Sequence, residues 1–195
     1  MVPEGWNKAT IGELCDFING HGFKSNEWSK KGLPIIRIQN LNGSREFNYY
    51  AGEPDSKWLV EEGQLLFAWA GTKGVSFGPT KWNGPKGVLN QHIYKSITNE
   101  GVEANWFYEA LVRVTEQIEQ QAYGFKATLL HVKKSDITSR IVLVPDVSEQ
   151  SKIAQILSTW DKAIATTEKL IENSKAQKKA LMQQLLTGKQ RLGSE

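Results

Sequence analysis

The chain has 195 residues, of which 39% are hydrophobic and 23% are charged, so it is large enough for one folded domain, or for one domain with an appendage. It contains no apolar run of about 18 residues and no basic-then-apolar pattern at its N-terminus, which argues against a membrane span and a signal peptide. A net charge of +3 excludes a strongly basic or acidic protein, and a single cysteine, Cys15, excludes an internal disulfide framework and fits a reducing cytoplasm.

Strands and turns dominate the first two-thirds of the sequence. β-Branched and apolar runs predict strands at 34–41, 64–70, 88–97 and 139–144, and residues 75–77 are expected to continue the second strand as a hairpin beyond the turn at 71–74. Residues 105–123 have helical spacing, with Gly124 as a candidate C-cap. The apolar face of this helix is expected to hold Trp106, Ala110, Leu111, Val114, Ile118 and Ala122. These elements predict one mixed α/β domain over residues 1–147.

Residues 148–188 predict one long helix, which starts at a candidate N-cap, Ser148, and meets no proline or glycine before Gly188. Residues 189–195 form a short tail. Within the helix, steps of four and three residues alternate as in a heptad seam, whose middle is polar at Thr167, Ser174 and Lys178. The apolar members of the seam are Ile153, Leu157, Trp160, Ile164, Ile171, Leu181 and Leu185.

The length of this helix indicates that it needs a partner. A helix of ~37 residues is ~56 Å long, whereas a domain of ~150 residues has a radius of gyration of ~15 Å. We therefore expect much of the helix to project from its domain and to bind a partner through the seam. The alternative is a helix that folds back onto its own domain.

Motifs of common enzymes are missing. The three histidines, His21, His92 and His131, are dispersed and form no metal-ligand pair. The sequence also lacks a Gly-x-Ser-x-Gly elbow, a P-loop and the Asn/Asp-Pro-Pro-Tyr/Phe motif of adenine methyltransferases. We therefore expect a protein without catalytic residues and without a metal site.

Charge is segregated along the first 148 residues, although their 16 basic and 16 acidic side chains cancel. Three windows, 28–45, 63–99 and 120–135, contain no acid but carry lysines and arginines. If these windows meet in the fold, the domain has one basic face, which is typical of proteins that bind polyanions. The alternative, which is equally compatible with the charges alone, is that the lysines are scattered over the surface.

The C-terminal residues resemble the specificity (S) subunit of type I restriction-modification systems. The matching pattern is Glu149-Gln150, Ile153-Ala154, Ile156-Leu157, Asp161 and the segment 178–188, KALMQQLLTG preceded by lysine. The N-terminal part resembles a target recognition domain of that family in Gly5-Trp6 and in the segments 11–14, 34–37, 64–67 and 90–92. Asp146-Val147 departs from the family, which has a second proline and a leucine there.

This resemblance implies an α+β fold: one globular mixed α/β target recognition domain followed by a single long C-terminal coiled-coil helix. A full S subunit has two such halves, so the chain resembles a half-size or truncated form. A second copy, packed antiparallel through the helix, would supply the missing half and give a palindromic, bipartite DNA site. At ~3.4 Å per base pair, ~56 Å corresponds to roughly 16 base pairs. The implied partners are double-stranded DNA, methyltransferase (M) subunits bringing AdoMet, and a restriction (R) subunit using ATP with Mg. The expected location is the cytoplasm of a bacterium or archaeon.

Candidate DNA-binding residues come from charge and turn context alone, because recognition loops vary within the family. Phosphates are bound mainly by Lys and Arg, and base edges by Arg, Lys, Asn, Gln and Ser. The candidates are Lys24, Ser25, Asn26, Arg37, Lys73, Lys81, Asn83, Lys86, Gln91, His92, Lys126 and Thr128. Arg37 and His92 have structural roles as alternatives, and Trp82 is expected mainly in packing.

Two other classes of function remain open at this point. A coiled-coil scaffold without a DNA role would use the heptads but would leave the acid-free windows unexplained. An enzyme that uses Cys15 or His92 would lose activity on Cys15→Ser or His92→Ala substitution.

Overall fold

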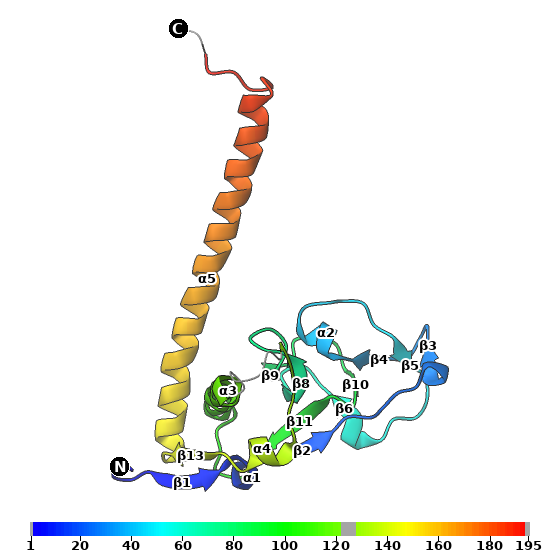
Figure 1. Ribbon diagram of the computed structural model, residues 1–195, viewed down its shortest axis with the longest axis vertical. Helices are drawn as coiled ribbons and strands as arrows, with labels where there is room; N and C mark the ends of the chain where they lie inside the picture. Colours follow the sequence, from blue (N-terminus) through cyan, green and yellow to red (C-terminus); the bar gives the residue numbers. More distant parts are fainter. Residues whose placement is uncertain (1, 122–127, 194–195) are drawn as a thin grey trace. The chain divides into compact units, whose positions relative to one another are not determined.

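The computed structural model describes residues 2–121 and 128–193. Five α-helices, two short 3-10 helices and thirteen strands lie in these residues (Figure 1). The helices are α1 (Ile11–Leu14), α2 (Ile38–Leu41), α3 (Ala104–Gln121), α4 (Lys134–Thr138), α5 (Val147–Leu186), η1 (Ser25–Glu27) and η2 (Ser56–Trp58). The strands are β1 (Asn7–Thr10), β2 (Cys15–Asn19), β3 (Trp28–Ser29), β4 (Leu33–Ile36), β5 (Tyr49–Tyr50), β6 (Leu59–Val60), β7 (Leu65–Ala68), β8 (Ala70–Thr72), β9 (Gly78–Lys81), β10 (Gly87–Leu89), β11 (Ile93–Thr98), β12 (Leu129–His131) and β13 (Ile141–Val144).

The chain divides into two compact units, Met1–Ser151 and Lys152–Glu195. The first unit contains all the strands and α1–α4, together with the first turn of α5; the second contains the rest of α5. The α+β class with one long C-terminal helix, predicted from the sequence, is confirmed. No helix in the described parts of the chain is both long and apolar enough to cross a membrane.

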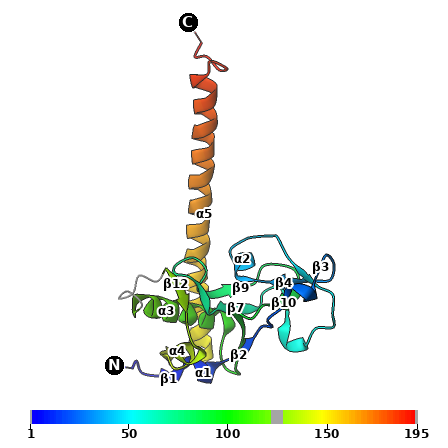
Figure 2. The ribbon, with the colours of Figure 1, turned by 45° about the vertical axis from the view of Figure 1, so that its right-hand side comes forward.

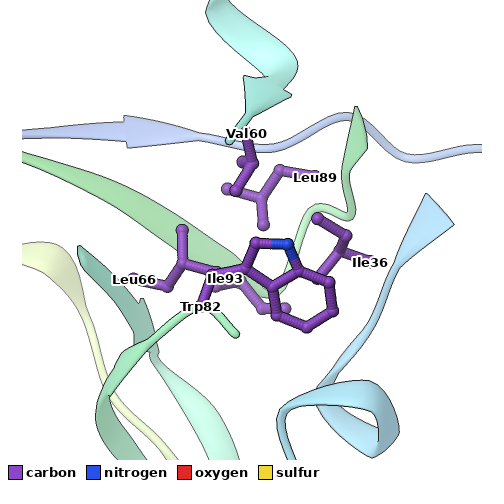
Figure 3. Close-up of a cluster of buried hydrophobic side chains, with 6 residues drawn as sticks. All are labelled: Ile36, Val60, Leu66, Trp82, Leu89 and Ile93. Atoms are coloured by element: carbon purple, nitrogen blue, oxygen red, sulfur yellow. The ribbon is translucent and has the colours of Figure 1, made fainter. Parts of the chain in front are cut away.

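Two sheets form the centre of the first unit. One has the order β3-β5-β4-β10-β6, with β4 and β10 parallel, and the other has the order β2-β11-β7-β9 and is antiparallel throughout. A buried cluster joins side chains from both sheets (Figure 3). Its members are Ile36, Val60, Leu66, Trp82, Leu89 and Ile93. Three of the apolar runs recognised in the sequence, 34–41, 64–70 and 88–97, therefore contribute buried strands to the core. The fourth, 139–144, forms β13 in the separate β1–β13 ribbon and is only partly buried.

The α3 helix packs on β9 of the antiparallel sheet. Its predicted apolar face is confirmed at Trp106, Leu111, Val114 and Ile118, which are all buried. Ala110 is half-buried, and the expected positions of Ala122 and Gly124 lie outside the described residues. At the other end of this unit, α1 and α4 lie side by side next to the β1–β13 ribbon (Figure 2).

The prediction of one strand over 34–41 is wrong in its second half. The strand β4 ends at Ile36, and residues 38–41 form α2. Asn40 explains the change, because its Oδ1 accepts the backbone N–H of Arg37 at 2.9 Å and its Nδ2 donates to the carbonyls of Ser44 and Glu46. Asn40 is 6% exposed, so its amide needs these partners, and only a turn brings them together. Arg37 therefore lies at the start of a helix and not on a strand.

Two further strand predictions differ from the structure. Residues 75–77 form a turn and no hairpin strand, because the carbonyl of Thr72 accepts the N–H groups of all three of them. The hairpin partner of β7 is β9, which begins at Gly78. The run 88–97 is two strands, since residues 90–92 carry the chain from β10 in one sheet to β11 in the other.

The start of α5 is fixed by polar contacts within the first unit. Asp146, and not the predicted Ser148, caps the helix, because its Oδ1 accepts the N–H of Glu149 at 3.0 Å. The carboxylate of Glu149 accepts the indole N–H of Trp6. Gln150 is 1% exposed; its Oε1 accepts the N–H of Glu103 at 2.8 Å. Its Nε2 donates to the carbonyls of Pro145 at 3.0 Å and Gly101 at 3.3 Å, so every hydrogen-bonding group of this amide is used within its own unit.

Candidate nucleic-acid interface

Lys24, Ser25 and Asn26 lie at η1 and are exposed. The backbone of this turn is held by Glu27, whose Oε2 accepts the N–H of Lys24 at 2.8 Å. The same carboxylate lies 3.6 Å from Nε2 of His21, and the ring of His21 stacks on Trp58 with 4.1 Å between centroids. The Glu27 carboxylate therefore holds the turn and places a negative charge next to Lys24.

Lys73 and Thr128 are brought together at the open end of the β8–β12 ribbon. The N–H of Lys73 donates to the carbonyl of Thr128 at 3.0 Å, and Thr128 is exposed. Glu119 of α3 holds the same loop, since its backbone carbonyl accepts Nζ of Lys73 and its Oε1 accepts the N–H of Gly74. Lys126, the other candidate near this loop, lies outside the described residues.

Lys81 and Lys86 both contact groups from outside the acid-free windows. Nζ of Lys81 donates to Oδ1 of Asn105 at 2.9 Å and lies 4.5 Å from the centroid of the Tyr108 ring. Nζ of Lys86 forms an ion pair with Glu61 at 2.7 Å. The windows are therefore free of acids in sequence but not in space, and part of their positive charge is neutralised.

Gln91 and His92 lie in the crossing between the two sheets, next to an aromatic group that the sequence did not single out. The indole N–H of Trp69 donates to the carbonyl of Gln91 at 3.1 Å, and the Trp69 ring lies 5.2 Å from the ring of His92. His131 of β12 packs edge-on against the same indole at 4.7 Å. Only the pairing of β12 with β8 places His131 there, so no sequence signal could have found this cluster.

Arg37 and Asn83 lie on different elements. The guanidinium of Arg37 stacks 4.4 Å above the Trp28 ring, so its contact in the structure is an internal cation–π contact.

Asn83 is exposed on the loop after β9, at the rim of a cleft of about 370 Å³. Arg45, which was not among the candidates, lines the same cleft. Its position at the end of an acid-free window, two residues after Gly43, was the signal that could have selected it.

Trp82 is 5% exposed, in agreement with the expectation that it packs. Cys15 is also buried, and burial raises the pKa of its thiol to about 12, which keeps it protonated and unreactive. Among the described residues, no group of three or more His, Cys, Asp or Glu side chains is arranged to hold a metal ion.

In the second unit, the apolar side chains of the heptad seam are exposed. Six of the seven predicted members have at least 39% of their surface accessible, and Ile153 is half-buried. The six are Leu157, Trp160, Ile164, Ile171, Leu181 and Leu185. A stripe of large apolar side chains this long is a surface that association would cover.

Comparison with known proteins decides the family. The model of the type I restriction modification DNA specificity domain matches residues 3–174, which cover the first unit and more than half of α5. The chain belongs to this family.

Curated members of the specificity-subunit family match nearly the whole chain. The type I restriction enzyme EcoBI specificity subunit of Escherichia coli is 26% identical over 96% of this chain and 40% of its own length. The MjaVIII specificity subunit of Methanocaldococcus jannaschii is 25% identical over 95% of this chain and 43% of its own length. The chain therefore spans less than half the length of the specificity subunits that it matches.

Solved structures of specificity subunits share the fold. A chain from a study of complex assembly and conformational transition of the type I restriction-modification system has a TM-score of 0.73 at 19% identity, covering 94% of this chain and 45% of that one. The HsdS subunit from Thermoanaerobacter tengcongensis has a TM-score of 0.63 at 18% identity, covering 85% of this chain and 40% of its own. The S subunit from M. genitalium has a TM-score of 0.58 at 20% identity, covering 94% of this chain and 46% of its own.

Proposed function

We propose that this chain is the DNA recognition subunit of a type I restriction-modification complex and reads one half of a bipartite site. The observation that carries the proposal is the family match over residues 3–174 together with the length of the chain, which is 40–46% of the curated specificity subunits. One domain and one long helix correspond to one half of such a subunit. The chain itself would do no chemistry.

The second half would come from a second copy, packed antiparallel along α5. The seam supports this arrangement because it is nearly symmetric about its middle, between Glu168 and Leu170. In an antiparallel pair centred there, Ile153 faces Leu185 and Leu157 faces Leu181 of the other copy, so the two strongly apolar ends cover each other. Nearer the two-fold axis, each polar seam residue faces an apolar one: Lys178 faces Trp160, Ser174 faces Ile164 and Thr167 faces Ile171 of the other copy.

The length of α5 would set the distance between the two recognition domains. With 40 residues the helix is ~60 Å long, which corresponds to ~18 base pairs at ~3.4 Å per pair. Two identical readers related by a two-fold axis would select a palindromic site with an unread spacer. M subunits bringing AdoMet and an R subunit using ATP with Mg would supply methylation and cleavage in the cytoplasm of the cell.

Methylome sequencing tests the function directly. Cells that co-express this chain with its M subunit should carry adenine methylation at one palindromic, bipartite motif. A non-palindromic bipartite motif would show that a different half-subunit is the partner. Absence of any motif, together with no salt-dependent retention of the chain on a DNA column, would favour the alternative of a coiled-coil scaffold.

Cysteine cross-linking tests the antiparallel pairing. In a Cys15→Ser background, Leu157→Cys with Leu181→Cys should form disulfide-linked dimers under mild oxidation, because the two positions face each other between copies. Within one helix they are ~36 Å apart, so an internal bond is impossible. The matched control is Leu157→Cys alone, which should remain monomeric on a non-reducing gel. Cross-linking of the single variant would indicate a parallel pair and refute the arrangement.

A further inference from the structure

The cleft of about 370 Å³ next to Trp82 lies between two loops from different parts of the first unit, residues 40–47 and 82–85. Phe47 and Trp82 provide its apolar lining, and their rings meet edge to face with 6.5 Å between centroids. Trp82 itself is part of the core between the two sheets (Figure 3). The cleft therefore lies directly on the buried core of the first unit.

Both loops are fixed at their bases by buried side chains. Asn40 donates from Nδ2 to the carbonyl of Ser44 at 3.1 Å and to that of Glu46 at 2.9 Å, which holds the first loop on either side of its tip. Trp82 donates its indole N–H to the carbonyl of Pro85 at 2.9 Å, which closes the second loop. The backbone of Gly84 lies so close to the same indole that a Cβ at this position would overlap the ring. The backbone of the cleft is thus preorganised.

The tips of the two loops carry Arg45 and Asn83, which are both exposed. Neither side chain has a hydrogen-bond or ion-pair partner anywhere in residues 2–121 and 128–193. This separates them from Lys81 and Lys86, which already contact Asn105 and Glu61. Arginine binds guanine bidentately through O6 and N7, and asparagine binds adenine bidentately through N6 and N7.

We propose that Arg45 and Asn83 are specificity-determining residues, which read base edges in the major groove of DNA from the two rims of this cleft. The inference rests on the proposed function and adds to it the residues that choose the sequence. Preorganised loops suit this role, since reading a base edge requires the donor and acceptor atoms to be held in place before contact.

The test is the methylated motif of cells that co-express the M subunit with the wild-type chain, Arg45→Ala or Asn83→Ala. Each variant should lose discrimination at one or two base pairs of each half-site, with the preference for the correct base falling about 5- to 150-fold there and unchanged elsewhere. The matched control is Arg113→Ala on α3, which removes an exposed arginine that pairs with Glu116; it should leave the motif unchanged. Substitution at the two exposed tips should not impair folding, which thermal unfolding of each variant checks.

Three outcomes would overturn the inference. The first is a motif that stays unchanged in both variants although the wild type gives a clear one; the proposed function then stands without these readers. The second is DNA binding by the Arg45→Ala variant that is weakened equally for all sequences, with the slope of log K against log salt reduced by about 1. That result would make Arg45 a phosphate contact. The third is a wild-type chain that gives no motif, in which case the proposed function itself fails.

Discussion

Replacing Gln150 by leucine should destabilise the first unit strongly, although leucine is apolar, similar in size and a good helix former. The amide of Gln150 makes three hydrogen bonds, to the N–H of Glu103 and to the carbonyls of Pro145 and Gly101, at 2.8, 3.0 and 3.3 Å. Gly101 is exposed, so its carbonyl can turn to water. The N–H of the half-buried Glu103 and the carbonyl of the buried Pro145 would lose their partners beneath the new leucine side chain.

The expected cost follows from these two groups. A buried polar group left without a partner costs about 1–3 kcal/mol, so two of them cost about 2–6 kcal/mol. Taking ~3 kcal/mol, and a shift of ~2–4 °C per kcal/mol for a chain of this size, the unfolding midpoint should fall by about 6–12 °C.

Calorimetry at one fixed protein concentration measures this shift, since association would otherwise change the midpoint. The matched control is Gln155→Leu, which makes the same replacement on an exposed face of the same helix and should change the midpoint little. Equal midpoints for Gln150→Leu and Gln155→Leu would refute the reasoning, because the buried amide would then have no greater value than an exposed one.

Three further predictions address the core, the seam and a close backbone contact. Burial raises the pKa of the Cys15 thiol from 9.0 to about 12, so at pH 8 the reactive thiolate is about 10³-fold rarer in the native protein than in denaturant. Alkylation of Cys15 should be slower in the native protein by at least that factor. Equal rates measured with a chromogenic thiol reagent would show that the site is open to solvent. Leu157→Asp with Leu185→Asp should yield monomers in sedimentation, since each helix would bring two charges and each helix pair would have to bury four; a surviving dimer would exclude this seam. Gly20→Ala should lower the free energy of unfolding, measured by chemical denaturation, by more than about 1 kcal/mol, because the new Cβ would collide with the backbone at the end of β10. Gly193→Ala is the control and should leave this free energy unchanged, because a Cβ there meets no other atom.

Features encoded in local patterns were predictable from the sequence. The long helix follows from an unbroken heptad pattern, and its bounds differ from the expected 148–188 by only one or two residues. The apolar face of α3 follows from its spacing in the same way. The α2 helix at residues 38–41, where a strand was predicted, could not be foreseen from the sequence. The contacts that decide it join the Asn40 side chain to carbonyls four and six residues further on, and in the sequence Asn40 is only one polar residue within an apolar run.

The candidate interface was less predictable than the fold, because its charge depends on pairing between distant segments. Lys86 is opposed by Glu61, and the loop of Lys73 is held by Glu119, although neither acid is in the same window. The cleft between residues 40–47 and 82–85 exists only because β4 and β10 are neighbours in one sheet, which brings together loops about forty residues apart. Asn83 could be named from the sequence, whereas its place at the same cleft as Arg45 required the fold.

The way the two cleft loops are anchored has a consequence for how this protein can diversify. Asn40 and Trp82 hold the loops from below, while the exposed tip side chains of Arg45 and Asn83 make no hydrogen bond or ion pair with the described residues. Most substitutions at such tips change stability by less than about 0.5 kcal/mol. If Arg45 and Asn83 read DNA as proposed, a lineage carrying this domain could exchange its tip residues, and with them its DNA target, in a single step without first gaining stability to compensate, while the anchoring residues beneath them stay constant.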